Sequence, residues 1–172
     1  AILGLGNLGL ASALKLKDNG FNVLGWGRSK KEIQGVTTYH GNEGLNQILK
    51  VADIVVCLLP LTPETNNLLD KRKLDLLSSG TSIINFARAA IIDYKYLLEK
   101  IENSELSHAV LDVFDSEPLS ENSALWEDSN ITILPHISAP TNMKSAASIT
   151  AKHINDFFTM GKEPKFIDKQ KG

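Results

Sequence analysis

Short apolar segments alternate along this chain with longer segments whose apolar positions recur at helical spacing. Wholly or mostly apolar runs are typical of strands buried on both faces of a sheet, and they lie at 2–5, 54–59, 82–85, 108–113 and 131–134. A further strand is predicted to begin at 22–24. The helical pattern predicts helices at 8–19, 44–52, 71–77, 93–103 and 142–160. This alternation predicts an α/β fold with a doubly wound parallel sheet.

A glycine-rich turn joins the first predicted strand to the first predicted helix. Gly4 permits a tight turn, Gly6 lets the backbone approach a pyrophosphate, and Gly9 lets the helix pack close to the sheet. The free N–H groups at the start of that helix would face the phosphates. The following strand completes a βαβ unit, so we interpret the segment as a dinucleotide-binding, Rossmann-like motif. The alternative is a glycine turn that binds no ligand.

Composition narrows the class of protein further. The formal net charge of −2 over 172 residues indicates neither a nucleic-acid nor a membrane partner, and no apolar run reaches the roughly 20 residues of a membrane-spanning helix. Cys57 is the only cysteine and lies in an apolar run, which favours a buried, inert thiol and a reducing cytoplasm. His40, His108 and His153 are isolated from other potential ligands, so no metal site is expected.

The end of the second predicted strand bears on the choice of nicotinamide cofactor. An acidic side chain there would bind the ribose of NAD, but the chain continues from Gly27 into Arg28, Ser29, Lys30 and Lys31. Arg28 can pair with a 2′-phosphate and Ser29 can donate to it, each such bond contributing about 1.5–3 kcal/mol. The sequence therefore predicts a preference for NADPH over NADH. The alternative is a solvated basic turn, which remains open for the two lysines in particular.

Three ionisable residues follow three later strands of the predicted sheet. Arg88, Glu117 and His136 all lie beyond carboxyl ends of strands, where ligands of such sheets bind. Reduction of a ketone by hydride needs a proton donor that works near neutral pH and a positive group that holds the substrate; His136 and Arg88 meet these needs. Glu117 could orient the imidazole. Arg88 alone could be a surface cation and His136 alone a structural residue, but together they indicate a catalytic site.

These motifs and their order resemble the cofactor-binding portion of the D-isomer-specific 2-hydroxyacid dehydrogenases, and within that family the glyoxylate/hydroxypyruvate reductase branch. The motifs that carry the resemblance lie at 4–9, 59–65, 85–88, 111–118, 124–126 and 135–136. Ala89 and Ala90 depart from the glycine that the family usually has after the arginine, and Ser138 and Ala139 replace glycine-like residues after the histidine.

The resemblance implies a reductase of small 2-oxo acids and a role for each site residue. His136 would donate a proton to the 2-oxo group while NAD(P)H delivers hydride, Glu117 would orient His136, and Arg88 would bind the substrate carboxylate. Asp112 would contact the nicotinamide carboxamide. The other cofactor contacts would come from Asn7, Leu8, Leu59, Pro60, Phe86, Arg88 and Ser138. The resemblance also implies a homodimer.

The chain is expected to contain one complete domain and part of another. We expect residues 1–140 to form the dinucleotide-binding domain, and residues 141–172 to form a helix and tail that return to a substrate domain outside this chain, which is N-terminally truncated. Such a piece would bind cofactor yet reduce substrate poorly. Two other functions are alternatives. One is a dinucleotide-sensing, co-repressor-like module without turnover. The other is a 3-hydroxyacid dehydrogenase, but those enzymes characteristically use a lysine on a later helix, and the Glu117 and His136 pattern argues against it.

Overall fold

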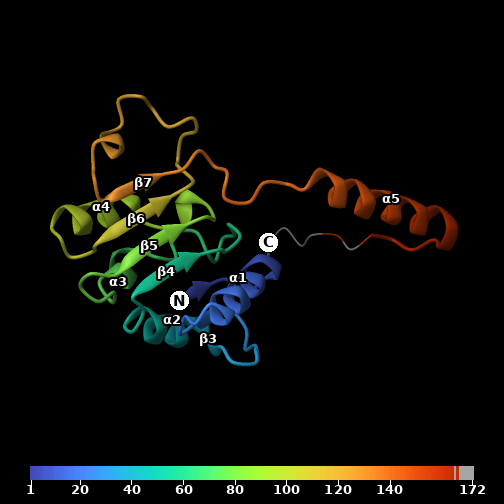
Figure 1. The fold of residues 1–172 in the computed structure, drawn as a ribbon, viewed down its shortest axis with the longest axis horizontal. Coiled ribbons are helices and arrows are strands. Elements are labelled where there is room, and N and C mark those ends of the chain that lie inside the picture. The colour runs from blue at the N-terminus through green and yellow to red at the C-terminus, as the bar shows by residue number, and fades with distance from the viewer. Residues whose placement is uncertain (165, 167–172) are drawn as a thin grey trace.

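A parallel sheet of seven strands forms the centre of the computed structural model, which describes residues 1–164 and 166 (Figure 1). Every pairing between named strands is parallel, and the order across the sheet is β3-β2-β1-β4-β5-β6-β7. The strands are β1 (Ile2–Leu3), β2 (Leu24–Gly27), β3 (Thr37–His40), β4 (Ile54–Cys57), β5 (Ser82–Asn85), β6 (His108–Leu111) and β7 (Ile131–Ile133). The predicted doubly wound α/β class is confirmed.

Two apolar cores lie on opposite faces of this sheet. The larger core contains side chains from α2 (Gly41–Leu49), α3 (Lys71–Leu74) and α4 (Tyr94–Glu102), packed on the central strands. The smaller core contains Ala13 from α1 (Asn7–Asp18), packed against Ile2 and Val23. The reversal of strand order at β1 places α1 on the face opposite the other three helices, because parallel crossovers keep one hand. The carboxyl ends of β1 and β4 therefore meet at the switch point of the sheet, where ligands bind in such folds.

Helix ends follow local sequence signals. The Asp93 carboxylate accepts a hydrogen bond from the Tyr96 N–H and caps α4, and Asn142 caps α5 (Met143–Met160) in the same way. Gly161 ends α5 in the left-handed conformation that glycine adopts without a steric penalty. The predicted helix at 71–77 is shorter in the structure, and the one at 44–52 begins earlier and ends earlier than predicted.

One strand was missed by the sequence interpretation. β3 is built from Thr37, Thr38, Tyr39 and His40, none of them buried, and it forms an edge of the sheet. An edge strand with polar residues lacks the apolar run that revealed the buried strands. The remaining predicted strands are present, although several end one or two residues earlier than expected.

Helix α5 extends away from the sheet (Figure 1) and exposes large apolar side chains, including Met143 and Phe158. Residues 165 and 167–172 of the predicted tail lie outside the described residues. Within residues 1–164 and 166, no helix has both the length and the apolar character needed to cross a membrane.

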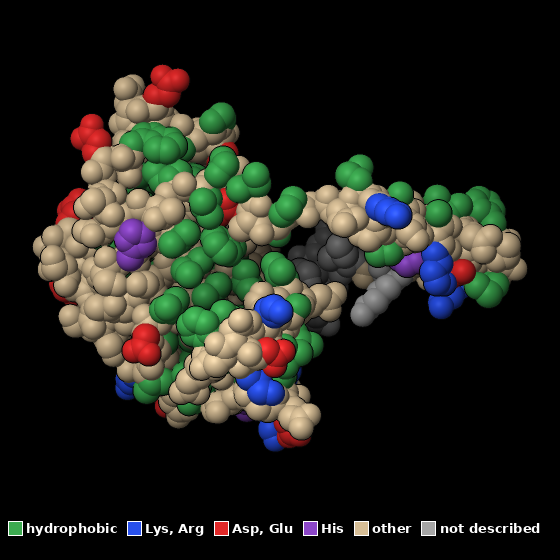
Figure 2. Space-filling view, in the orientation of Figure 1, with side chains coloured by type: hydrophobic (Ala, Val, Ile, Leu, Met, Phe, Trp, Pro, Cys, Tyr) green, Lys and Arg blue, Asp and Glu red, His purple; other side chains and the backbone are tan. Residues whose placement is uncertain are grey.

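An open apolar groove lies beside α1 on its face of the sheet. Its volume is about 700 Å³, and its lining includes Ile54 and Val56 of β4, Ile84 of β5, and Phe86. Figure 2 shows apolar side chains gathered across this face. Ile54 is 42% exposed although it belongs to a central strand of a parallel sheet. The helices that the structure describes therefore leave this part of the sheet exposed to solvent.

Candidate active site and cofactor cradle

The glycine-rich turn after β1 has the geometry that its spacing predicts. Gly4 has a φ of +105°, and a Cβ there would lie 2.6 Å from the carbonyl oxygen of Leu58. A Cβ on Gly9 would lie 1.7 Å from the carbonyl oxygen of Gly4. Both positions therefore require glycine, the first for its backbone angle and the second for the close approach of α1 to the turn.

Gly6 differs from these two glycines because it faces open space. Among the described atoms, none beyond its chain neighbours and its own helix backbone would come within 4 Å of a Cβ at this position. Gly6 is also the N-cap of α1, and Asn7 and Leu8 follow it, exposed, in the first turn. A free helix N-terminus beside an open backbone suits the pyrophosphate of a dinucleotide. The residues present thus fit the predicted cofactor.

The residues predicted to contact the cofactor differ in how accessible their side chains are. Leu8, Phe86 and Ser138 line the groove beside α1, and Pro60 is exposed. Leu59 is only 6% exposed and belongs to the larger core, so its backbone rather than its side chain is available to a ligand.

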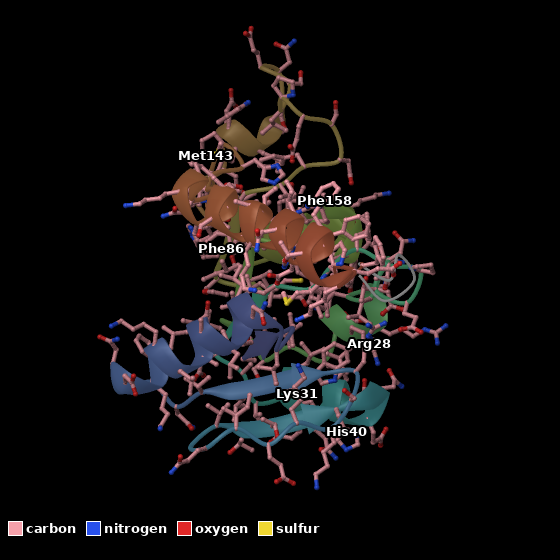
Figure 3. The ribbon with its side chains drawn as sticks, turned by 90° about the vertical axis from the view of Figure 1, so that its right-hand side faces the viewer. Arg28, Lys31, His40, Phe86, Met143 and Phe158 are labelled. Carbon is pink, nitrogen blue, oxygen red and sulfur yellow. The ribbon has the colours of Figure 1, made fainter. Side chains whose placement is uncertain are left out.

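Side chains of the basic turn after β2 contact neighbouring loops. Arg28 Nη1 donates a hydrogen bond of 2.7 Å to Oε2 of Glu64, and Lys31 Nζ lies 2.5 Å from the carbonyl oxygen of Leu5 in the glycine-rich turn. Figure 3 shows where Arg28 and Lys31 lie. Lys31 is therefore more than a solvated cation, whereas Lys30 pairs only with its exposed neighbour Glu32 among the partners identified.

His136 and Glu117 form a hydrogen-bonded pair in an open pocket of about 520 Å³. The Nδ1 atom of His136 lies 2.8 Å from Oε2 of Glu117, and Oε1 of Glu117 accepts a 2.9 Å hydrogen bond from the Phe114 N–H. The hydrogen bond from His136, followed by the one from Phe114, lowers the pKa of Glu117. Because a carboxylate faces Nδ1, that nitrogen carries the hydrogen and Nε2 is the atom that can exchange a proton with a ligand.

Arg88 lies near this pair. It follows β5, the strand beside β6, and its positive charge also contributes to lowering the pKa of Glu117. Arg88 is exposed, and its Nη1 donates a hydrogen bond of 2.6 Å to the carbonyl oxygen of Ala87. The three ionisable residues proposed from the sequence therefore lie beyond the carboxyl ends of three adjacent strands, β5, β6 and β7.

Asp112 holds the loop that carries His136. Its carboxylate, 1% exposed, accepts hydrogen bonds from the N–H groups of Ile137 and Ser138 and from the Ser138 hydroxyl. Burial alone would raise the pKa of Asp112, but these hydrogen bonds outweigh it and the pKa falls below its ordinary value. Since both oxygens already bind this loop, a contact with a nicotinamide carboxamide would have to be shared with it.

The backbone of His136 explains why this loop needs an anchor. His136 has a φ of +53°, in the left-handed region that non-glycine residues adopt at a cost. The two residues held by Asp112 follow it directly. We therefore assign Asp112 a positioning role that the sequence interpretation, which gave it a cofactor contact, missed.

A second buried polar network ties the ends of β5 and β6 together. The Asn85 side chain is fully buried; its Nδ2 donates to the Arg88 carbonyl and to the Tyr94 hydroxyl, and its Oδ1 accepts from the Ala87 N–H. The Tyr94 hydroxyl donates to the carbonyl oxygen of Val113. Asn85 thus shapes the turn that presents Arg88. A polar residue at the end of an apolar strand was the available signal for Asn85, whereas nothing in the local pattern distinguished Tyr94.

Within residues 1–164 and 166, no three His, Cys, Asp or Glu side chains are grouped so that they could hold a metal ion.

Comparison with known proteins identifies the family. Residues 1–138 match the model of the NAD-binding domain of D-isomer-specific 2-hydroxyacid dehydrogenases. A curated relative, glyoxylate/hydroxypyruvate reductase A of Serratia proteamaculans, is 40% identical over 153 residues, which are 89% of this chain and 49% of the relative.

Solved structures agree with this match. The NADPH-dependent glyoxylate/hydroxypyruvate reductase of Sinorhizobium meliloti, in complex with NADP and sulfate, superposes with a TM-score of 0.93 at 34% identity, covering 99% of this chain and 55% of that one. A D-isomer-specific 2-hydroxyacid dehydrogenase of Xanthobacter autotrophicus, in complex with NADPH and MES, gives 0.92 at 37% identity, covering 98% and 70%.

The present chain spans about half the length of the curated relatives it matches. The match over residues 1–138 takes in the glycine-rich turn, Arg88, Glu117 and His136. The chain therefore belongs to the D-isomer-specific 2-hydroxyacid dehydrogenase family and contains its NAD-binding domain.

Proposed function

We propose that this chain is the cofactor-binding part of an NADPH-dependent reductase that converts small 2-oxo acids, of the glyoxylate or hydroxypyruvate type, into 2-hydroxy acids. The observation that carries the proposal is the hydrogen-bonded pair of His136 and Glu117 in a pocket at the same sheet edge as the glycine-rich turn. Such a pair is what a hydride-linked reduction of a carbonyl requires from the protein.

The proton in this reaction comes from His136. When bound, the nicotinamide cofactor supplies a hydride to the carbonyl carbon of the substrate. The protonated imidazole of His136 gives its Nε2 proton to the carbonyl oxygen, so the product carries a neutral hydroxyl group beside its carboxylate and the imidazole becomes neutral. Glu117 accepts a hydrogen bond from the Nδ1–H of His136 and so holds the imidazole with Nε2 directed away from the carboxylate. The side chain of His136 is 49% exposed, so solvent can return the proton.

Arg88 holds the acid end of the substrate. A guanidinium binds a carboxylate through two parallel hydrogen bonds, which fixes the orientation of the neighbouring carbonyl. Asn85 supports this role because it hydrogen-bonds the backbone on both sides of the Arg88 turn. Its burial keeps that support independent of solvent.

The preference for NADPH rests on the basic turn after β2. Arg28 and Ser29 are exposed beside the carboxyl end of β2, where the adenosine ribose lies in dinucleotide domains of this type. The relatives from Sinorhizobium and Xanthobacter, which bind NADP and NADPH, support the same choice. Gly6 and the N-terminus of α1 would hold the pyrophosphate, and Leu8, Phe86 and Ser138 would line the path toward the nicotinamide.

Kinetic assay of the complete encoded protein tests the proposal. Oxidation of NADPH should depend on added glyoxylate or hydroxypyruvate, with a higher kcat/KM than for NADH. Tight NADPH binding without any oxidation, at any concentration of either acid, would overturn the reductase assignment and favour a dinucleotide sensor.

A further inference from the structure

We propose that Glu64 limits the preference of this protein for NADPH by competing with the 2′-phosphate for Arg28. The inference rests on the proposed use of NADPH and adds a residue that acts on that choice. Its basis is the 2.7 Å hydrogen bond between Arg28 Nη1 and Glu64 Oε2. Arg28 thus already has a carboxylate partner at the position where the phosphate would bind.

The position of this contact in the sheet indicates which part of a dinucleotide would lie beside it. Arg28 follows β2 and Glu64 lies in the loop after β4, and these two strands flank β1. The glycine-rich turn follows β1, so the contact joins the two loops on either side of the predicted phosphate cradle. A carboxylate in such a place lies close to the adenosine end of a dinucleotide.

The backbone around Glu64 is held firmly in place by its neighbours. Thr62 and Thr65 are 4% and 2% exposed, and the Thr65 hydroxyl both accepts a hydrogen bond from the Thr62 N–H and donates one to the Pro60 carbonyl. These buried contacts fix the turn on which Glu64 stands, while its own side chain is 67% exposed. This fixed backbone keeps Glu64 at a position from which its carboxylate reaches Arg28.

Electrostatics gives the direction of the effect. A 2′-phosphate carries about −1.5 to −2 charges near neutral pH, so it is attracted by Arg28 and repelled by the Glu64 carboxylate. NADH has hydroxyl groups at this end, and a carboxylate can accept hydrogen bonds from them. Glu64 thus weakens NADPH binding and leaves NADH binding unchanged or slightly stronger. Because both side chains are partly exposed, the effect on affinity is modest and screened by salt.

Binding measurements on the complete encoded protein test this inference. We expect Glu64→Gln to lower the Kd for NADPH by about threefold to tenfold at low salt, without lowering the Kd for NADH. The same comparison with ADP-ribose and its 2′-phosphate isolates the adenosine end. The gain should shrink at high salt. Glu99→Gln, which removes an exposed carboxylate on α4, is the matched control and should change neither Kd.

The outcomes separate this inference from the proposed function. Unchanged or weaker NADPH binding by Glu64→Gln, in protein with wild-type thermal stability, overturns the competition. The Arg28→Ala variant tests the underlying cofactor choice. If Arg28→Ala leaves the ratio of the NADPH and NADH affinities as in wild type, the NADPH assignment itself fails, and the Glu64 inference with it. If Arg28→Ala lowers the NADPH preference and Glu64→Gln does not raise it, only the Glu64 inference fails.

Discussion

The imidazole of His136 and the carboxylate of Glu117 are hydrogen-bonded at 2.8 Å, although 19 residues separate them along the chain. The intervening segment forms the short helix η2 (Ala124–Trp126) and strand β7 before it returns to the same pocket. Glu117 is itself held by the Phe114 N–H, directly beyond β6. The pair is thus positioned from two adjacent strands, and the orientation of the imidazole does not depend on a bound ligand.

Replacing His136 by alanine should abolish turnover and spare cofactor binding. Loss of a proton donor of this kind lowers kcat by about 10²-fold to 10⁴-fold. Steady-state kinetics of the complete protein, with NADPH affinity measured separately, provides the check. His40→Ala, which removes an exposed histidine at the start of α2, is the control. Retention of wild-type kcat by His136→Ala would remove His136 from the role of proton donor.

The contribution of Glu117 to stability should depend on pH. Its pKa lies below the ordinary value of 4.5, first because of the hydrogen bond from His136 and then because of the Phe114 N–H. A lowered carboxyl pKa adds stability above the ordinary pKa, and this stability is lost as the pH falls through the folded-state pKa. Wild type should therefore have a higher Tm than Glu117→Gln at about pH 6, and the difference should shrink as the pH falls below the ordinary carboxyl pKa and through the lowered folded-state pKa of Glu117.

Thermal unfolding, monitored by circular dichroism and repeated across this pH range, measures the difference in Tm. Glu121→Gln, which removes an exposed carboxylate a few residues away, should track wild type throughout. A difference between wild type and Glu117→Gln that persists unchanged at low pH would contradict the assigned cause.

Asp112→Asn should destabilise the loop after β7. The asparagine keeps the size of the side chain but presents an amide N–H₂ where the carboxylate now accepts from Ile137 and Ser138. The loss of charge-assisted hydrogen bonds at a buried site costs about 2 kcal/mol of unfolding free energy. Urea unfolding measures it, with the exposed Asp115→Asn as control. In the complete protein kcat should fall as well, since His136 loses its backbone anchor; a stable variant with wild-type kcat would refute the positioning role.

Gly6 and Gly9 should respond differently to the same substitution. Gly9→Ala places a Cβ 1.7 Å from a backbone oxygen, so α1 must move and unfolding free energy falls by about 3 kcal/mol. Gly6→Ala has open space in the structure and should fold with nearly wild-type stability, yet weaken dinucleotide binding where the pyrophosphate approaches. Calorimetric titration with NADPH and thermal unfolding separate the two effects. Equal NADPH affinity in Gly6→Ala and wild type would exclude that approach.

The buried strands and the edge strand β7 were predictable from the sequence, and the edge strand β3 was not. Strands β4 and β5 are recognisable in the sequence as apolar runs because they lie at the centre of a parallel sheet. β3 lies at an edge of the sheet beside β2, where few apolar residues are needed. Its polar sequence therefore lacks the apolar run that indicates a strand. The glycine spacing was informative because Gly4 satisfies a backbone requirement and Gly9 a steric one.

The sequence indicated which kinds of residue form the candidate site, but it indicated only some of the hydrogen bonds between them. The hydrogen bond between His136 and Glu117 was anticipated because chemistry demands an acidic partner for the imidazole. The contacts of Asp112 with Ser138, and of Arg28 with Glu64, join positions 26 and 36 residues apart. Neither follows from periodicity, because each depends on how loops from neighbouring strands bend toward each other.

The apolar groove beside α1 affects how unfolding of this chain can be followed. Dyes that fluoresce on apolar surfaces will bind Ile54, Ile84 and their neighbours in the native state. The dye signal will therefore be high before heating begins and will not mark the loss of structure. Backbone circular dichroism and tryptophan emission are the suitable probes, the latter because Trp26 is 3% exposed and Trp126 53% exposed, so the two indoles report on the core and the surface separately.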